Sequence, residues 1–593
     1  MAAATLEASP SPVVPAGGAF LLGPLAGARV HAPEGFTEDQ RLYYQTAAQF
    51  MAREVMPHVE RLEKKDYPLL VSLLRKAGEA GLLSIEIPEA YGGLDLDRTT
   101  SMLVAEAMTT FGTWSVSIGA HTGIGSLPIV FFGNDEQKKK YLPKLATAEW
   151  LACYALTESG SGSDALGAKT KAVLSADGKH YVLNGNKQFI TNAGFADVFI
   201  VFAKIDGDKF TGFIVERKMP GLVVGKEEHK MGLRGSSTCQ LAFEDCQVPV
   251  ENVLGQIGKG HRIAFGILNM GRLKLGVGST GGSKNAINLA YAYAKDRKQF
   301  GKSLLEFALI REKLARMAAR TYALESMAYR TCGLIDDKLR AIGGEKANHE
   351  LVIQTLEEYS IESSILKVFG SETLGATIDE AVQIHGGYGY IEEYSVERAY
   401  RDQRINRIFE GTNEINRMLI TGMLLKKAVK GQLPLMEAVQ GLDAPLPAVP
   451  AGPLGAEREA AERVKRMALL ALKPAVETFG PGLEERQEIL AALADVVIEA
   501  FAIESAAART LEFDAGSAVR QSLCRLFTFE ARERAHDRAR YALCCTLKGA
   551  DLEKALAALE RTRGSSPIDP VAERETIMGG IAAAEGYPFP IRA

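Results

Sequence analysis

The chain has 593 residues, of which 47% are hydrophobic and 24% charged, and its formal net charge is −4. This length is too great for one hydrophobic core and predicts three or four domains. A chain of this size with so small a net charge is not expected to bind nucleic acid through electrostatic attraction. Local basic clusters, such as residues 138–140 and 426–430, are explained by solvent-exposed helix faces.

Cysteine usage and the composition of the N-terminus indicate which cellular compartment the protein suits. The seven cysteines are irregularly spaced, without a CxxC pair or Cys/His cluster, so we expect reduced thiols and no metal site. The first 35 residues are rich in Ala, Pro and Gly and carry a single arginine, Arg29, which fits neither a secretory signal nor a mitochondrial presequence. No uninterrupted run of about 18 apolar residues occurs, and we therefore expect no membrane span.

The N-terminal third has a helical pattern. Thr37, followed by Glu38 and Asp39, predicts a helix start, because acidic residues are favoured in the first turn. Apolar residues recur at helical spacing over residues 43–62, and residues 88–93 (PEAYGG) predict a turn before helical periodicity resumes.

From about residue 153 the sequence pattern changes to short runs of residues that favour β-strands. They cover residues 181–183, 198–203, 212–215 and 240–243. Three dipeptides that tolerate positive φ predict turns between strands: Asp177-Gly178, Asn184-Gly185 and Asp206-Gly207.

After residue 260 the chain is helical again, with long amphipathic stretches over residues 309–334 and 354–369. Residues 442–455 carry four prolines and predict a linker, and a further helical region follows. The fold predicted is therefore α+β and mainly helical, and the bunching of the strands argues against a doubly wound sheet. The predicted parts are an N-terminal extension (1–36), a helical domain (37–152), a middle β domain (153–258), a helical bundle domain (259–432), a linker (433–456) and an extra C-terminal helical domain (457–593).

Two segments in the β region could face a cofactor. Residues 154–164 (YALTESGSGSD) alternate small hydroxyls with glycines, which can direct N–H and O–H groups at an anion, although a surface turn explains them equally well. In residues 187–194 (KQFITNAG) an aromatic beside a hydroxyl could stack on a flat ring, but a core strand would look the same.

Two segments of the helical region could also bind a ligand. Residues 296–301 (DRKQFG) offer Arg297 for a phosphate and Phe300 for a ring, whereas a helix C-terminus with basic charge and a Gly stop is the plainer interpretation. Residues 383–390 (QIHGGYGY) allow a ligand close to the backbone, and His385 alone is typical of a structural histidine.

The segment at residues 407–417 (RIFEGTNEINR) contains the candidate base. Glu410 follows an apolar pair, and Thr412 or Asn413 resembles the N-cap of the next helix. A carboxylate in an apolar pocket has a raised pKa and can act as a base near neutral pH, while a carboxylate near a helix start is more often structural.

Taken in this order, the five segments resemble the acyl-CoA dehydrogenase family. TESGSGSD is similar to its TEPGAGSD loop, FIT to its WIT triplet and DRKQFG to its R-x-x-F-G segment; QIHGGYGY is similar to Q-x-x-GG-x-G and IFEGTNEI to YEGT. The 27 residues from Gln383 to Glu410 also fit. Residues 142–146, 267–272, 309–318 and 323–329 resemble the very-long-chain branch, which also carries an extra helical C-terminal domain.

The resemblance implies FAD as cofactor and no metal, with Glu410 as the catalytic base. The expected FAD contacts are Tyr154, Leu156, Thr157, Ser163, Phe189, Ile190, Thr191, Arg297, Phe300, Gln383, Gly386, Gly387, Thr412 and Glu414, with Arg297 and Phe300 reaching FAD of the partner subunit. The expected substrate contacts are Ser163, Asn269, Arg272 and Gly411. Two positions depart from the family pattern, because Phe189 replaces the usual Trp and Ser159 the usual Pro.

The implied reaction is α,β-desaturation of a long-chain fatty acyl-CoA in β-oxidation, with an electron-transfer flavoprotein as acceptor and a homodimer as assembly. The family's second base position falls on residues 269–272 (NMGR), where no carboxylate occurs, so Glu410 is the only candidate. The small side chains of residues 115–120 (SVSIGA) favour a deep channel for long acyl chains.

Some questions stay open from the sequence. An oxidase on the same fold and a catalytically silent assembly protein are the alternatives to the dehydrogenase. The resemblance implies a peripheral membrane contact through the C-terminal domain, whereas helices packed on the dimer body would explain the same residues. The expected location is cytoplasmic in a bacterium, with membrane association, or the matrix side in a mitochondrion.

Overall fold

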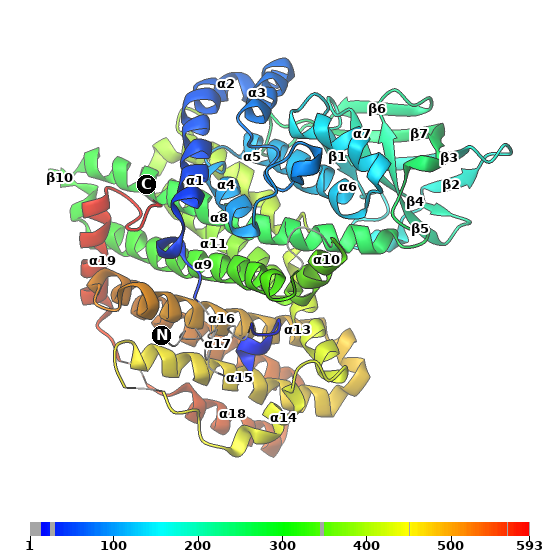
Figure 1. Cartoon of the computed structure of the whole chain (residues 1–593). Coiled ribbons are helices and arrows are strands. Elements are labelled where there is room, and N and C mark those ends of the chain that lie inside the picture. The colour runs from blue at the N-terminus through cyan, green and yellow to red at the C-terminus, as the bar shows by residue number, and fades with distance from the viewer. Residues whose placement is uncertain (1–13, 24–29, 344–348, 450, 566, 592–593) are drawn as a thin grey trace, which may run out of the picture.

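The computed structural model of the chain describes residues 14–23, 30–343, 349–449, 451–565 and 567–591 (Figure 1). Arg29 and most of the predicted N-terminal extension lie outside the described residues. The described part of that extension is built into the protein, since Phe20 is buried and its ring lies 4.7 Å from that of Phe501 in the C-terminal region.

A cluster of short helices forms the N-terminal region. They are α1 (Glu38–Phe50), α2 (Val59–Glu63), α3 (Tyr67–Glu79), α4 (Arg98–Ala107), α5 (Gly112–Gly119), α6 (Leu127–Phe132) and α7 (Asp135–Ala146). The predicted start of α1 is confirmed, because the Thr37 hydroxyl accepts a hydrogen bond from the Gln40 N–H and the Gln40 side chain accepts one from the Thr37 N–H. The predicted turn at residues 88–93 is also confirmed, as a single 3₁₀ turn closed by Gly92 at φ +82°.

One helical segment bears on the expectation about membrane spans. Within the described residues, the segment Gly112–Phe132 is helical, long and apolar enough to cross a membrane. A count of uninterrupted apolar residues misses it, because polar residues recur along it: Thr113, Ser115, Ser117, His121, Thr122 and Ser126. Most of this segment is buried inside the protein, as is typical of a core helix.

The middle region is a sheet with strand order β6-β7-β3-β2-β4-β5-β8, in which β1 also pairs with β4. Its strands are β1 (Ala152–Ala155), β2 (Lys171–Leu174), β3 (His180–Thr191), β4 (Val198–Ile205), β5 (Lys209–Glu216), β6 (Leu222–Glu227), β7 (Thr238–Pro249) and β8 (Val253–Leu254). The pairs β1–β4 and β2–β4 are parallel and the others antiparallel. All four predicted β runs lie on strands, while β1, β2, β6 and β8 were not anticipated.

One predicted turn is wrong. Asn184-Gly185 lies inside β3, where a register shift against β7 marks a bulge. Gly185 has φ +150°, and a Cβ there would lie 2.6 Å from the Thr170 hydroxyl, so the glycine serves close strand packing rather than chain reversal. Gly178 and Gly207 do turn the chain, each with positive φ between neighbouring strands.

Long helices cross the centre of the molecule and a second helical layer lies below them (Figure 1). The central helices are α8 (Gly260–Asp296), α9 (Ala308–Ala341), α10 (His349–Glu358), α11 (Ser360–His385), α12 (Ser395–Gln403) and α13 (Asn413–Val429). The second layer contains α14 (Leu435–Gln440), α15 (Gly455–Phe479), α16 (Gln487–Asp514), α17 (Ala518–Thr546), α18 (Gly549–Arg563) and α19 (Pro570–Ala584). The predicted stretch 354–369 is interrupted at Tyr359, and the predicted linker contains α14.

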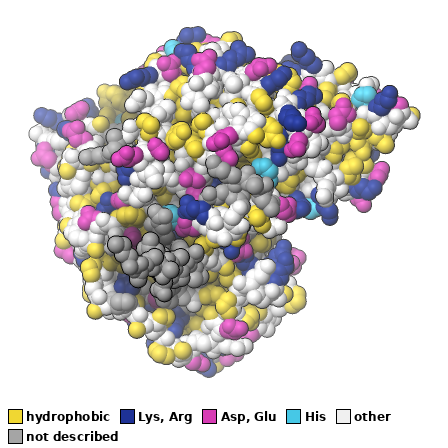
Figure 2. Space-filling model, viewed as in Figure 1, with side chains coloured by type: hydrophobic (Ala, Val, Ile, Leu, Met, Phe, Trp, Pro, Cys, Tyr) yellow, Lys and Arg dark blue, Asp and Glu magenta, His cyan; other side chains and the backbone are white. Residues whose placement is uncertain are grey.

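The second helical layer is joined to the rest by buried polar contacts. Arg509 of α16 binds Glu325 of α9 at 2.7 Å and Glu34 of the segment before α1 at 2.8 Å. The C-terminal tail returns to the central helices, where the Tyr587 hydroxyl donates to Glu325 at 2.9 Å. The predicted fold class, α+β and mainly helical with an extra C-terminal domain, is thus confirmed. On the face seen in Figure 2, acidic and basic side chains are interspersed.

Candidate active site

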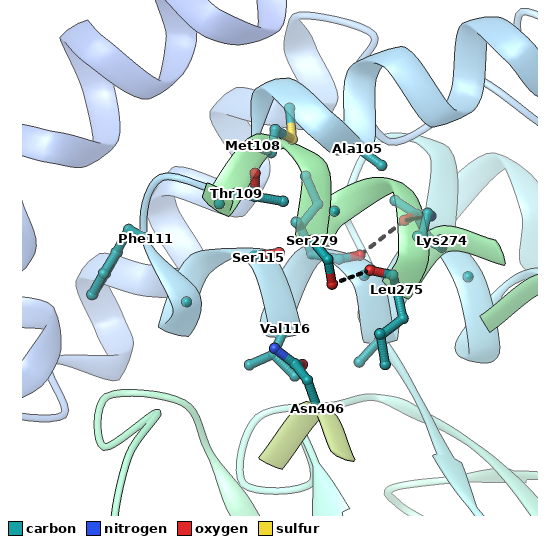
Figure 3. A pocket seen from close by; sticks show the side chains of 18 of the residues that line it. Ala105, Met108, Thr109, Phe111, Ser115, Val116, Lys274, Leu275, Ser279 and Asn406 are labelled. Carbon is teal, nitrogen blue, oxygen red and sulfur yellow. Dashed lines mark hydrogen bonds between the residues drawn. The ribbon is translucent and has the colours of Figure 1, made fainter. Parts of the chain in front are cut away.

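A cavity of about 340 Å³ lies between α4, α5 and α8 and reaches the loop before α13 (Figure 3). Its wall is mostly apolar, and Ser115, Val116, Ile118, Gly119 and Ala120 of the small-residue segment all contribute to it. One face of α8 runs along it from Ile267 to Leu289. Glu410 contributes a carboxylate to this wall.

The Glu410 side chain is enclosed by protein apart from the side that faces the cavity. Its backbone has φ +59°, and its Oε2 is buried without a hydrogen-bond partner among the described residues. Burial raises the pKa of Glu410 to about 7, although the positive charges of Arg272 and Lys367 lower it in part. A carboxylate with this pKa and one free oxygen is suited to accept a proton near neutral pH.

The loop that carries Glu410 is held from both sides. The Asn416 amide donates to the carbonyl oxygens of Gly411 at 2.8 Å and Thr412 at 3.0 Å. The Thr412 hydroxyl caps α13 by accepting a hydrogen bond from the Ile415 N–H, so of the two N-cap candidates Thr412 is the one observed. Arg272 of α8 donates through Nε to the Glu410 carbonyl oxygen at 3.2 Å.

Arg272 and Asn269, the predicted substrate contacts on α8, lie together. Arg272 Nη1 donates to Asn269 Oδ1 at 2.9 Å, and both side chains are buried. Burial lowers the pKa of Arg272, while the negative charge of Glu410 raises it. The structure therefore brings Asn269, Arg272, Glu410 and Gly411 into one cluster.

Lys367 of α11 is a second cation near the base. Its Nζ donates to Asn413 Oδ1 at 2.7 Å, and the side chain is fully buried. Burial lowers the pKa of Lys367 to about 7, and the charge of Glu410 raises it in part. Two groups that titrate in the same pH range thus lie close together.

Of the residues predicted to line a flavin, Tyr154 and Thr191 lie near the base, and the set differs in exposure. Tyr154 and Leu156 are buried, and the Tyr154 hydroxyl has no hydrogen-bond partner among the described residues. Burial, followed by the charge of Glu410, raises the pKa of Tyr154. Thr157 is half-buried and Ser163 exposed. At the end of β3, Ile190 is buried and Thr191 lines the cavity.

Phe189 is exposed although it is a large aromatic residue. Its side chain is 59% exposed and its backbone has φ +60°. A bulky residue at positive φ is strained, and such strain is often found at ligand sites. Thr412 is half-buried and Glu414 exposed, both directly after the base.

The other predicted cofactor residues lie far from Glu410 in the same chain. Arg297 follows Arg272 by 25 residues, and the helix between them spans about 38 Å. Gln383, Gly386 and Gly387 stand at the far end of α11, and the Arg297 guanidinium lies 5.5 Å from the Tyr388 ring centre. Phe300 is 93% exposed on the short hairpin after α8. One chain alone therefore does not assemble the whole predicted set.

Comparison with known proteins decides the family. Domain profiles of the acyl-CoA dehydrogenases match residues 37–149 (N-terminal domain), 153–246 (middle domain) and 258–425 and 463–561 (both described as C-terminal domain). The chain belongs to the acyl-CoA dehydrogenase family. Its enzymes are FAD-dependent oxidoreductases.

Individual relatives agree with this assignment. A probable acyl-CoA dehydrogenase of Bacillus subtilis is 47% identical over 582 residues, which cover 96% of this chain and 98% of that one. The human mitochondrial very long-chain specific acyl-CoA dehydrogenase is 41% identical over 353 residues, or 58% of this chain and 51% of that one. The crystal structure of an acyl-CoA dehydrogenase from Bacillus anthracis complexed with FAD is 46% identical, with a TM-score of 0.94 over 96% of this chain and 99% of that chain.

Three residues of this acyl-CoA dehydrogenase site were not anticipated from the sequence: Gly271, Lys367 and Asn416. A Cβ at Gly271 would lie 2.5 Å from Glu410 Oε2, so the absence of a carboxylate from residues 269–272 is matched by an absence of space at position 271. Lys367 is a lone charge within the apolar run ILKVFG of α11, and this pattern could have indicated a buried functional lysine. No comparable signal marks Asn416, whose role depends on the loop conformation.

Proposed function

We propose that this acyl-CoA dehydrogenase removes hydrogen from Cα and Cβ of long-chain fatty acyl-CoA to give the trans-2-enoyl-CoA, as a step of β-oxidation, with Glu410 as the base that takes the α-proton. The observation that carries the proposal is the Glu410 carboxylate, which is desolvated, has a pKa raised to about 7 and faces an apolar cavity. An α-C–H is a weak acid, so the base must work where water does not compete and where the developing enolate is stabilised.

The chain itself offers a donor for that enolate. The Glu410 N–H has no hydrogen-bond partner among the described residues. A thioester oxygen placed against this N–H would keep the α-carbon beside the carboxylate. Arg272 and Asn416 fix the loop from the other side, so the donor and the base are positioned together.

The residues present fit FAD. Tyr154 offers a buried hydroxyl without a partner, Phe189 an uncovered aromatic ring, and Gly160 and Gly162 open backbone with nothing within 4 Å of a Cβ position. These groups suit the edge, the face and the phosphates of a flavin nucleotide. When bound, FAD supplies at N5 the acceptor for the β-hydride.

Assembly as a homodimer would complete the cofactor site. Five of the predicted cofactor residues lie far from Glu410 within one chain, and all five are exposed: Arg297, Phe300, Gln383, Gly386 and Gly387. A second copy that presents this end to the Glu410 region of its partner would bring both halves together. For the electron acceptor we propose an electron-transfer flavoprotein; a 37% identical relative is named as a subunit of a caffeyl-CoA reductase-Etf complex.

The preference for long chains rests on the extent of the cavity. Its α8 wall runs from Gly271, beside the base, to Leu289, and 18 helical residues span about 27 Å. Small residues line the cavity on both sides, Ser115 and Gly119 on α5 and Gly278 on α8, so side chains occupy little of it. A channel of this length with apolar walls favours long hydrocarbon chains.

Anaerobic bleaching of the flavin by saturated acyl-CoAs of increasing length tests the proposal. We expect the greatest kcat/KM at C14 or longer, and a maximum at C4–C8 would reject the long-chain assignment. Glu410→Gln should remain yellow and lose turnover; more than a few per cent of residual activity would reject Glu410 as the base. Stoichiometric peroxide under air would identify an oxidase, and a colourless protein that takes up no FAD would identify an assembly protein.

A further inference from the structure

A lysine without a counter-charge lies in the wall of the cavity. Lys274 follows Gly271 by three residues on α8, so it lies on the same helix face about 4.5 Å further along the axis. Its Nζ donates to the Thr122 hydroxyl at 3.3 Å, and within the described part of the chain it makes no ion pair. Figure 3 shows Lys274 on the helix that also carries Leu275 and Ser279, opposite Ser115 and Val116.

Four buried lysines of this chain are paired with carboxylates. Lys187 binds Glu158 at 2.7 Å, Lys427 binds Glu358 at 2.9 Å and Lys465 binds Glu504 at 2.5 Å. Lys284 lies between Glu106 and Glu325. An ammonium group that leaves water without such a partner is destabilising, so a lysine held only by a threonine hydroxyl differs from the structural lysines around it.

Three acidic residues line the cavity, Glu86, Asp402 and Glu410, and in the described part of the chain none of them forms an ion pair with Lys274. Glu86 lines the cavity, but it is paired with Arg98 and accepts a hydrogen bond from the Ser101 hydroxyl at 2.8 Å. Lys274 is half-buried and lines the cavity. Burial, together with the charge of Arg98, lowers the pKa of Lys274 to about 8, so most of the population remains charged at neutral pH.

We propose that Lys274 forms a second polar subsite in the acyl channel, which binds an oxygen acceptor carried by the acyl chain a few carbons beyond the reacting Cα–Cβ bond. This inference rests on the proposed function and adds to it the class of chain that the channel takes. A plain hydrocarbon offers Nζ no acceptor and must pass a charged group. A chain with a carboxylate or hydroxyl satisfies the donors of Nζ and can still extend between α5 and α8.

The proposal distinguishes this subsite from the catalytic centre. Glu410 and the cluster around Arg272 act on the thioester end and treat all acyl chains alike. Lys274 acts on a substituent, so it alters the ratio of kcat/KM between two chains of equal length. The position of the substituent that gives the largest ratio reports the distance from the base to Nζ.

The test compares chains of matched length with the FAD-loaded enzyme. Unsubstituted, ω-hydroxy and ω-carboxy acyl-CoAs of six to ten carbons are assayed with the wild type, with Lys274→Met, and with Lys295→Met as a control for a lysine at the exposed end of α8. We expect the wild type to prefer an oxygen-bearing chain at one length by about tenfold or more, as for a hydrogen bond to a charged group. Lys274→Met should abolish this preference and raise kcat/KM for the unsubstituted chain, while Lys295→Met should keep the wild-type ratio.

The substrate arms separate the outcomes. Preference for the carboxylate alone identifies an anionic chain end as the ligand, and preference for both substituents identifies a general oxygen acceptor; both support the subsite. A wild type that prefers the unsubstituted chain at every length overturns it without any variant, as does an unchanged ratio in Lys274→Met. Failure of every acyl-CoA to bleach the flavin would instead overturn the proposed function itself.

Discussion

Gly271 and Glu410 face each other across the catalytic end of the cavity so closely that no side chain fits between them. A Cβ on Gly271 would lie 2.5 Å from Oε2 and 2.8 Å from Oε1 of Glu410. The residues belong to different segments, α8 and the loop before α13, and both line the cavity. The glycine therefore leaves room for the carboxylate at the position where the α-proton must be taken.

Gly271→Ala should keep the FAD and lose most of its turnover. The added methyl group must push the carboxylate aside or tilt α8, and small displacements of a catalytic base cost large factors in rate, here at least about 100-fold in kcat. The free energy of unfolding should change little, because the helix preference of alanine over glycine, about 1 kcal/mol, offsets part of the cost of the close contact with Glu410. The measurement is single-turnover bleaching of the bound flavin beside a thermal melt.

Gly422→Ala is the matched control for that variant. Gly422 is also a helical glycine, in α13, and nothing lies within 4 Å of its Cβ position. Its activity should equal that of the wild type. If Gly271→Ala kept wild-type kcat, the contact between residues 271 and 410 would have no catalytic meaning.

The pKa of Glu410 predicts the pH dependence of the reaction. Burial raises the pKa to about 7, and only the deprotonated carboxylate can take a proton. In the free enzyme, kcat/KM should therefore increase tenfold per pH unit below about pH 7 and level off above it. Stopped-flow bleaching between pH 5.5 and 8.5 measures this, and a profile that is flat over this range would contradict the assignment of Glu410.

Lys367 should tune that profile. Its positive charge lowers the pKa of Glu410, so Lys367→Met should move the midpoint of kcat/KM to higher pH and reduce the rate at pH 7. Lys367→Arg retains the charge and should leave the midpoint closer to that of the wild type. A role of Lys367 in packing alone would reduce activity by the same factor at every pH.

The sequence anticipated parts of the site that are continuous along the chain. Glu410, Thr412 and Gly411 are neighbours, and one motif marks all three. Gly271 and Lys274 have no local signal, because their importance depends on where α8 meets that loop and the cavity. Lys367 has one, as a lone charge in an apolar run, but the pattern does not indicate which residues it contacts. The same limit produced the error at Asn184-Gly185, where a glycine typical of turns is required instead by the side chain of Thr170, the residue directly before β2.

The fold followed more readily from the sequence than the site did. Hydrophobic periodicity and turn residues were sufficient to separate helical from β regions, since each depends on nearby residues. The contacts that join the C-terminal helices to the rest were not foreseen. They are made by charged side chains such as Arg509 and Glu34, which a sequence reader would assign to the surface.

Arg509→Met should destabilise the whole chain rather than the C-terminal helices alone. Arg509 is buried and binds Glu34 before α1 and Glu325 of α9, so its loss leaves two carboxylates short of a cation at the centre of the molecule. Arg509 also holds the pKa of Glu34 down to about 2, against the effect of burial. Removing one partner of a buried ion pair costs about 3–5 kcal/mol, and the remaining contacts of Glu34 with Arg520 and of Glu325 with Lys284 favour the lower end.

Urea and thermal midpoints should both fall in Arg509→Met, whereas Arg540→Met, which removes an exposed pair with Asp537, should melt like the wild type. Equal midpoints for the two variants would show that the buried network does not join the helical layers energetically.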